Sequence, residues 1–153
     1  MIFRSLDRKL CLHTSSAKKT QKIAFELAQS FKNGGIIALK GDLGAGKTTF
    51  TQGIARGLGV TQKLISPTFI LMREYNLPSN SLGRLYHLDL YRLEKVAEIL
   101  NLVGDLFSNP NNVILIEWAD KIENELPRNL TWIKLTNLGG NKRSIEILET
   151  NDS

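Results

Sequence analysis

A glycine-rich segment, residues 41–48, constrains the fold of this chain more than any other feature. It reads Gly-Asp-Leu-Gly-Ala-Gly-Lys-Thr and matches the phosphate-binding pattern G-x-x-x-x-G-K-[ST] at every fixed position. Glycines let the backbone wrap closely around an anion, so that successive N–H groups point toward it. The segment follows an apolar run, residues 36–39, and opens a predicted helix from Lys47 to about Leu58. A buried strand, a phosphate-binding turn and a helix in this order predict a P-loop nucleotide site.

Two side chains at the end of this loop supply the expected chemistry. Lys47 is placed to reach the β- and γ-phosphates of a nucleotide as a point charge. The Thr48 hydroxyl is placed to ligate Mg²⁺. The positive end of the helix dipole faces the same anion.

The rest of the chain alternates between strand-like and helix-like patterns. A first strand around Leu10 and Leu12 is followed by a helix whose apolar face runs from Ile23 to Phe31. Residues 93–103 have a helical pattern. Further strands are expected at Thr68–Tyr75, Leu82–Leu88, Val113–Ile116, Leu130–Leu135 and Ser144–Leu148. This order predicts an α/β chain: one P-loop ATPase domain over residues 1–153, with a three-layer fold and a mixed, mainly parallel central sheet flanked by helices.

Two acidic residues follow predicted strands, where a P-loop site needs a carboxylate for Mg²⁺. Glu117 comes directly after the apolar run 113–116, and Asp89 ends a less apolar strand. Ligands of an α/β sheet gather at the carboxyl ends of its strands, so both acids are expected to face the phosphates. One would ligate the metal, directly or through water, and the other would position the attacking water. The alternative for each is a strand-end acid that caps the following helix or pairs with Arg92 or Lys121.

Residues 66–69, Ser-Pro-Thr-Phe, lie between the P-loop helix and the next strand. In GTPase-like folds a switch segment meets the γ-phosphate at this place, and Thr68 would supply a hydroxyl there. A plain turn is the alternative. Trp118 is expected to line the nucleotide pocket or a partner surface, or else to pack in the core. For the isolated histidines, His13 and His87, ordinary packing or surface roles are expected.

Composition narrows the class of protein. Residues 1–63 hold 11 basic and 3 acidic side chains, a net charge of +8, while the remaining 90 residues carry −3. This basic half suits an anionic partner or a solvated face. No apolar run is long enough to span a membrane, and Cys11 is the single cysteine. We therefore expect a cytoplasmic protein without disulfides and without a membrane partner.

Four segments together resemble the TsaE (formerly YjeE) family of bacterial P-loop ATPases. They are GDLGAGKTT at 41–49, SPTF at 66–69, HLDLYR at 87–92 and IEW at 116–118, and the resemblance extends over nearly the whole chain. It implies an ATPase, weak when alone, that is required for N6-threonylcarbamoyladenosine (t6A) at position 37 of tRNAs reading ANN codons. It also implies ATP and Mg²⁺ as cofactors, a TsaD–TsaB heterodimer as partner, and tRNA reached through that complex.

The resemblance also implies roles for individual residues. Lys47, Asp89 and Glu117 would be the catalytic residues, and the metal would be held by Thr48, Asp89 and Glu117. The cofactor would be bound by Gly41, Asp42, Leu43, Gly44, Ala45, Gly46, Lys47, Thr48, Thr49 and Thr68. The family also uses residues near the first helix and the last hairpin to contact the nucleotide. Lys142 and Arg143 are candidates for this contact, but they are not among the predicted site residues.

Three other functions compete with this interpretation. A small-molecule P-loop kinase is the leading alternative, but it usually needs a lid with arginines, and Arg56, Arg73, Arg84 and Arg92 are scattered. A Ras-like GTPase would read guanine through Asn-Lys-x-Asp, and the nearest string, at 141–144, lacks the acid. A non-enzymatic RNA-binding module would leave the P-loop without a role.

Overall fold

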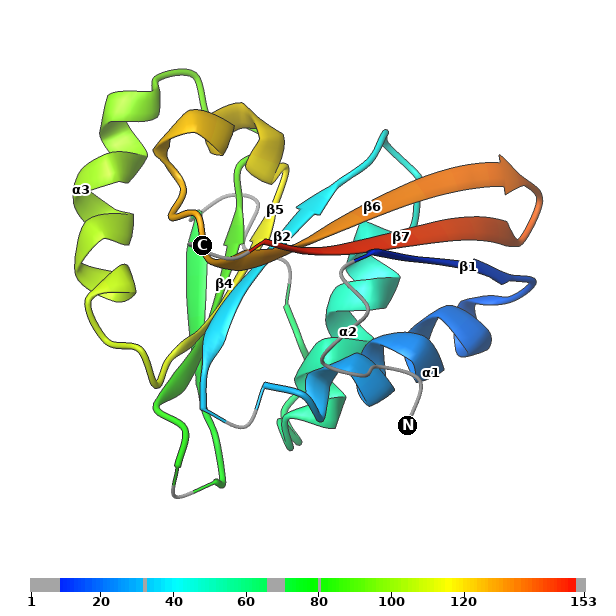
Figure 1. Cartoon of the computed structure of the whole chain (residues 1–153), viewed down its shortest axis with the longest axis horizontal. Coiled ribbons are helices and arrows are strands. Elements are labelled where there is room, and N and C mark those ends of the chain that lie inside the picture. Colours follow the sequence, from blue (N-terminus) through cyan, green and yellow to red (C-terminus); the bar gives the residue numbers. More distant parts are fainter. Residues whose placement is uncertain (1–8, 32, 66–70, 80, 151–153) are drawn as a thin grey trace.

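The computed structural model describes residues 9–31, 33–65, 71–79 and 81–150. Its centre is a seven-stranded mixed sheet with the strand order β1-β7-β6-β2-β5-β4-β3. Figure 1 shows this twisted sheet with helices packed on both faces. The predicted α/β class, with a three-layer arrangement and a mixed sheet, is confirmed. Within the described residues, no helix is both long and apolar enough to cross a membrane.

The four central strands run parallel to one another. β2 pairs with β5 on one side and with β6 on the other, and β5 pairs with β4. The bounds of these strands are β2 Gly35–Lys40, β4 Arg84–Asp89, β5 Val113–Glu117 and β6 Leu130–Gly139. Since parallel strands share their carboxyl edge, the ends of β2, β4 and β5 lie next to one another.

Antiparallel strands complete both edges of the sheet. β7, Lys142–Thr150, forms a hairpin with β6, and β1, Lys9–Thr14, pairs with β7. On the other edge, β3, Met72–Asn76, pairs with β4. The parallel part of the sheet is therefore protected on both sides by antiparallel strands.

Two helices cover one face of the sheet. α1, Ala17–Ala28, begins at Ser16, whose side chain accepts a hydrogen bond from the Lys19 N–H. α2, Lys47–Gly57, directly follows the P-loop and packs against α1. The apolar cluster on this face contains fully buried side chains from α1, α2 and β2, among them Leu27, Phe50 and Ile37. It fixes α2, and hence the P-loop, against the sheet.

The opposite face is covered by α3, Val96–Phe107, and by a short 3-10 segment, η1, Ala119–Glu125. A second apolar cluster joins them to the sheet through Ile99, Ile114 and Ile122. η1 follows β5 with one residue, Trp118, between them, and so its position is tied to the end of that strand.

Several boundaries differ from the sequence prediction. α3 begins three residues after Leu93 because a turn, closed by the Leu93 N–H to the Leu90 carbonyl, comes first. β6 and β7 are longer than predicted because residues 137–139, expected as a loop, extend the hairpin with a bulge. η1 was not predicted. The expected strand Thr68–Tyr75 is described only from residue 71 onward, and the Ser66–Phe69 segment lies outside the described residues.

Candidate functional site

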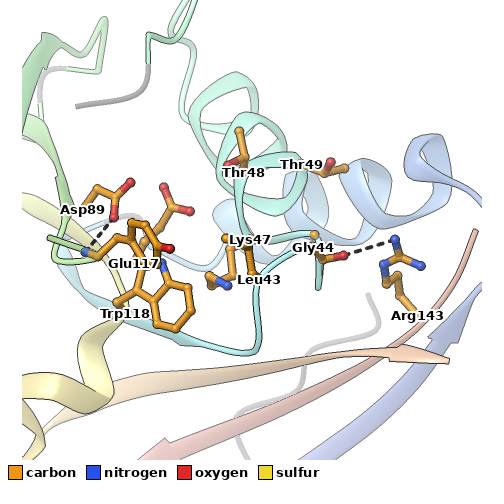
Figure 2. Close-up of a pocket in the computed structure, with 11 residues that line it drawn as sticks. Leu43, Gly44, Lys47, Thr48, Thr49, Asp89, Glu117, Trp118 and Arg143 are labelled. Carbon is orange, nitrogen blue, oxygen red and sulfur yellow. Dashed lines mark hydrogen bonds between the residues drawn. The ribbon is translucent and has the colours of Figure 1, made fainter. Parts of the chain in front are cut away.

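A cavity of about 500 Å³ opens where β2, β4 and β5 end. The P-loop and the start of α2 form one wall, the ends of β4 and β5 form the opposite wall, and the β6–β7 hairpin closes one side (Figure 2). The residues that line it are Leu43, Gly44, Gly46, Lys47, Thr48, Thr49, Asp89, Tyr91, Glu117, Trp118 and Arg143. Its place at the carboxyl edge of parallel strands is the usual place for a ligand in an α/β fold.

Two glycines of the loop are required by its geometry. A Cβ atom at Gly41 would lie 2.5 Å from the Leu135 carbonyl oxygen of β6, so no larger residue fits there without moving the loop. Gly46 precedes α2 with φ 102°, a left-handed conformation that favours glycine. Because glycine has no side chain to cap the helix, the first N–H groups of α2 remain available to an anion.

The Lys47 side chain lies against the loop itself. Its Nζ donates hydrogen bonds to the Gly41 carbonyl at 2.6 Å and to the Asp42 carbonyl at 2.9 Å. It also lies 4.1 Å from the centre of the Trp118 ring, which is a cation–π contact. Burial lowers the pKa of the Lys47 ammonium below its ordinary value, and nearby carboxylates, Glu117 first, oppose that shift. The loop carbonyls and the indole ring therefore hold the ammonium in place.

Asp89 and Glu117 are register partners at the ends of β4 and β5. Since side chains at the same level of neighbouring parallel strands point to the same face, the two carboxylates share the P-loop side of the sheet. Both are buried, with exposures of 9% and 3%. The Leu90 N–H donates to the Glu117 carbonyl at 3.1 Å and joins the two strand ends. The predicted convergence of the two acids on the phosphate loop is what the structure displays.

Asp89 also makes a local contact, which is a turn and not the cap on the following helix that was its alternative role. Its Oδ1 accepts a hydrogen bond from the Tyr91 N–H at 3.0 Å, as Figure 2 shows. This turn fixes the carboxylate at the cavity wall. In this fold Asp89 therefore makes the local turn and lines the cavity at the same time.

An aromatic pair forms the rim of the cavity opposite the loop. The Tyr91 and Trp118 rings are 5.1 Å apart, and the Lys121 Nζ donates to the Tyr91 carbonyl. Trp118 has φ 60°, a left-handed conformation that is uncommon for a bulky residue and is typical of functional sites. Trp118 lines the cavity and, partly buried, also packs against the second apolar cluster, so the structure places it in both of these expected roles.

Arg143 reaches the P-loop from the other end of the chain. Its guanidinium donates to the Gly44 carbonyl at 3.3 Å (Figure 2). It also donates to the Gly140 carbonyl at 2.8 Å. The neighbouring Lys142 lines a second cavity, of about 380 Å³, between the start of α1 and the hairpin. The other residues of this second cavity are His13, Thr14, Ser15, Lys19 and Leu138.

Most of the site residues predicted from the sequence meet at the first cavity. Leu43, Gly44, Gly46, Lys47, Thr48, Thr49, Asp89 and Glu117 line it. The remaining loop residues lie behind it: Gly41 and Asp42 hold Lys47 through their carbonyls, and Ala45 is buried in the core. Thr68 lies outside the described residues.

Comparison with known proteins identifies the family. The family model described as "Threonylcarbamoyl adenosine biosynthesis protein TsaE" matches residues 14–145. The chain belongs to the TsaE family. A tRNA threonylcarbamoyladenosine biosynthesis protein TsaE of Bacillus subtilis (strain 168) is 41% identical to this TsaE-family chain over 138 residues, which cover 90% of the chain and 84% of that protein. The namesake from Treponema pallidum (strain Nichols) is 33% identical, covering 86% and 95%.

A solved structure agrees with this assignment to the TsaE family. The crystal structure of Bacillus subtilis YdiB matches this chain with a TM-score of 0.75 and 34% sequence identity. The match covers 94% of this chain and 87% of that one. The fold described above is thus shared with a TsaE relative over nearly its full length.

For some residues of this TsaE-family site, the sequence predicted another role or no definite role. His87, expected to have a packing or surface role, lies 2.6 Å from Glu117. The sequence holds one indication of this position. His87 and Asp89 are two residues apart on one strand, so their side chains lie on the same face of the sheet. Tyr91 carried no signal of its own, because it lies beyond the strand end. Arg143 reaches the loop only through the hairpin, and its separation of 99 residues from Gly44 leaves no local pattern.

Proposed function

We propose that this TsaE-family protein binds Mg²⁺-ATP and hydrolyses it slowly, as an accessory of t6A formation at position 37 of tRNAs reading ANN codons. Its relatives are named for threonylcarbamoyladenosine biosynthesis, and they align over most of its length. One observation carries the chemical part of the proposal. The ammonium of Lys47, the Thr48 hydroxyl and the carboxylates of Asp89 and Glu117 line one cavity beside the P-loop. Phosphoryl transfer is catalysed mainly by such positioning and charge.

The residues at the cavity fit a magnesium ion. Among the described residues, no three His, Cys, Asp or Glu side chains group closely enough to hold a metal by themselves. Mg²⁺ does not need such a cage, since it is usually held by one or two carboxylates, the nucleotide phosphates and retained waters. Thr48 and Glu117 would hold it, directly or through water, and Asp89 lines the same cavity beside them. When bound, the ion supplies positive charge at the β- and γ-phosphate oxygens.

The chain's own groups would then divide the remaining tasks. The N–H groups of the loop and of the first turn of α2 bind the phosphates. Lys47 leaves the Gly41 and Asp42 carbonyls and donates instead to phosphate oxygens, where charge-assisted hydrogen bonds are stronger. We assign Glu117 to the metal and Asp89 to the attacking water, because the Tyr91 N–H already fixes one Asp89 oxygen at the cavity wall.

The nucleoside is proposed to lie toward the second cavity. Arg143 lines the first cavity and Lys142 lines the second, so both cavities border the start of β7. A nucleotide whose phosphates occupy the P-loop would extend along Arg143 toward Ser15 and Leu138. Apolar and polar groups combined in one cavity suit a base and a ribose.

The proposed setting is the cytoplasm, with a TsaD–TsaB heterodimer as the direct partner and tRNA reached through it. The support is the family and the names of its relatives. A decisive experiment adds this protein to purified TsaB, TsaD, tRNA and the threonylcarbamoyl donor, and measures modified adenosine with and without it. Unchanged multiple-turnover t6A formation would contradict the accessory role.

The nucleotide site has its own test. Calorimetry should show ATP binding to the wild-type protein and none to Lys47→Ala, because the substitution removes the cation at the β- and γ-phosphates. Lys134→Ala is a matched control, since this exposed lysine lies on β6 and does not line the cavity. Equal ATP affinity in Lys47→Ala and the wild type would refute the P-loop assignment, and phosphate transfer to a small acceptor would favour a kinase.

A further inference from the structure

A buried histidine holds one of the two carboxylates of the site. The Nε2 atom of His87, on β4, lies 2.6 Å from the Oε2 atom of Glu117, at the end of β5. Both side chains are almost completely buried, with exposures of 1% and 4%. His87 is the register partner of Leu115, two residues before Glu117. The Glu117 carboxylate therefore reaches diagonally across to β4.

The hydrogen in this contact belongs to the histidine. An ionised carboxylate only accepts, so Nε2 carries the N–H and donates it. The other ring nitrogen, Nδ1, is buried and has no hydrogen-bond partner in the described part of the chain. An unpaired buried nitrogen is costly and uncommon in native proteins. Among the described residues, Glu117 is therefore the one hydrogen-bond partner of this ring.

We propose that His87 is a positioning residue: it fixes the Glu117 carboxylate for the divalent cation at the nucleotide phosphates. The inference rests on the proposed function. Among the described residues, His87 is the one side chain that hydrogen-bonds Glu117. Holding Oε2 limits rotation of the carboxylate and leaves Oε1 for the ion. Partners of this kind orient metal ligands, and their loss typically weakens metal binding by roughly 10- to 100-fold.

Two amide substitutions test whether His87 acts as a hydrogen-bond donor to Glu117 or only fills space in the core. The amide nitrogen of glutamine occupies about the place of the histidine Nε2, while that of the shorter asparagine corresponds to Nδ1 and does not reach Glu117. His87→Gln and His87→Asn both bury an amide, so their effects on folding are comparable. The measured quantity is the affinity for Mn²⁺, followed by electron paramagnetic resonance, in the presence of a non-hydrolysable ATP analogue.

We expect His87→Gln to bind Mn²⁺ within about threefold of the wild type, and His87→Asn to bind it roughly 10- to 100-fold more weakly. Equal affinity in all three proteins would overturn the proposal. An equal loss in both variants would also overturn it, because a donor at the Nε2 position would then not suffice. A directly coordinated histidine nitrogen, detected by spin-echo modulation of bound Mn²⁺, would replace positioning with ligation and refute it as well.

A measurement on the unmodified protein keeps the inference testable if both variants misfold. Imidazole ¹⁵N NMR of metal-free protein should find the proton of His87 on Nε2. A ring protonated on Nδ1 alone could not donate to Glu117 and would refute the proposal. A different result would show that the proposed function is wrong. The wild-type protein would then bind neither the ATP analogue nor Mn²⁺ together with it.

Discussion

At the scale of single residues, Asp89 and Glu117 offer a way to separate two neighbouring carboxylates. Glu117→Ala should raise the Mg²⁺ concentration needed for half-maximal hydrolysis by roughly 10- to 100-fold, or about 1.4–2.7 kcal/mol. ATP affinity in the absence of metal should change much less, because the loop and Lys47 bind the phosphates. The measurement is a metal titration of hydrolysis beside calorimetry in EDTA. An unaltered metal titration would transfer the metal role to Asp89.

The contact between Lys47 and Trp118 supplies an optical signal. Nucleotide binding draws the ammonium from the indole ring, 4.1 Å away, so the fluorescence of Trp118 should change on titration with ATP. Since the chain has two tryptophans, the experiment is done with Trp132→Phe, which leaves Trp118 as the emitter. Lys47→Ala in the same background should give no change. A constant signal while calorimetry records binding would show that Lys47 stays on the ring.

The residue scale also shows where sequence analysis stops. The P-loop pattern predicts Lys47 and Thr48 because its chemistry is contained in eight consecutive residues. Asp89 and Glu117 are predicted because each comes at the end of a strand, and because ligands of an α/β sheet bind at the carboxyl ends of its strands. The contacts of His87 and Arg143 depend on the register of β4 against β5 and on the reach of the β6–β7 hairpin. Such distant pairings leave no pattern in neighbouring residues, so these two residues needed the structure.

At the scale of elements, the close contact of α1 with α2 controls the placement of the P-loop helix. A Cβ atom on Gly53 of α2 would lie 2.5 Å from the Gln21 carbonyl oxygen and 2.6 Å from the Ala24 Cβ of α1. The helices can approach this closely only because residue 53 has no side chain. Sequence periodicity predicted both helices, but nothing in that periodicity marks residue 53 as the place where they touch.

Gly53→Ala should therefore lower the free energy of unfolding by about 1–3 kcal/mol, the usual effect of overpacking. Gly104→Ala is the matched control on α3, where a Cβ meets no atom within 4 Å. There the better helix propensity of alanine should raise stability by up to about 1 kcal/mol. Urea denaturation measures both. If Gly53→Ala raised the free energy of unfolding instead, α1 would be able to move away from the new Cβ atom without loss of stability.

At the scale of the whole molecule, the basic N-terminal half is only partly explained by the site. Lys47 serves the loop, whereas Lys18, Lys19 and Lys22 are exposed on α1. Of these, Lys19 lines the second cavity. The other two are exposed, as is expected both of a solvated face and of a surface for a larger tRNA-bearing assembly. The sequence predicted the charge asymmetry, but which lysines lie near the nucleotide depends on how α1 packs beside the hairpin.

The isolated protein should hydrolyse ATP far more slowly than the roughly 1–100 s⁻¹ of typical kinases, because the proposed activity is that of an accessory. Phosphate release should rise when TsaD and TsaB are added. A coupled assay with Lys47→Ala as the blank measures both rates. Rapid turnover by the lone chain would contradict dependence on partners.

The position of β2 within the sheet has a consequence for biosynthesis. This strand carries the P-loop, yet one of its two neighbours is β6, which begins at Leu130. The Leu135 carbonyl that confines Gly41 also comes from β6. A nascent chain must therefore expose nearly all of its residues from the ribosome before the loop is enclosed on both sides. Prematurely terminated chains that lack β6 should not retain nucleotide, so interrupted translation would not leave competing ATP-binding fragments.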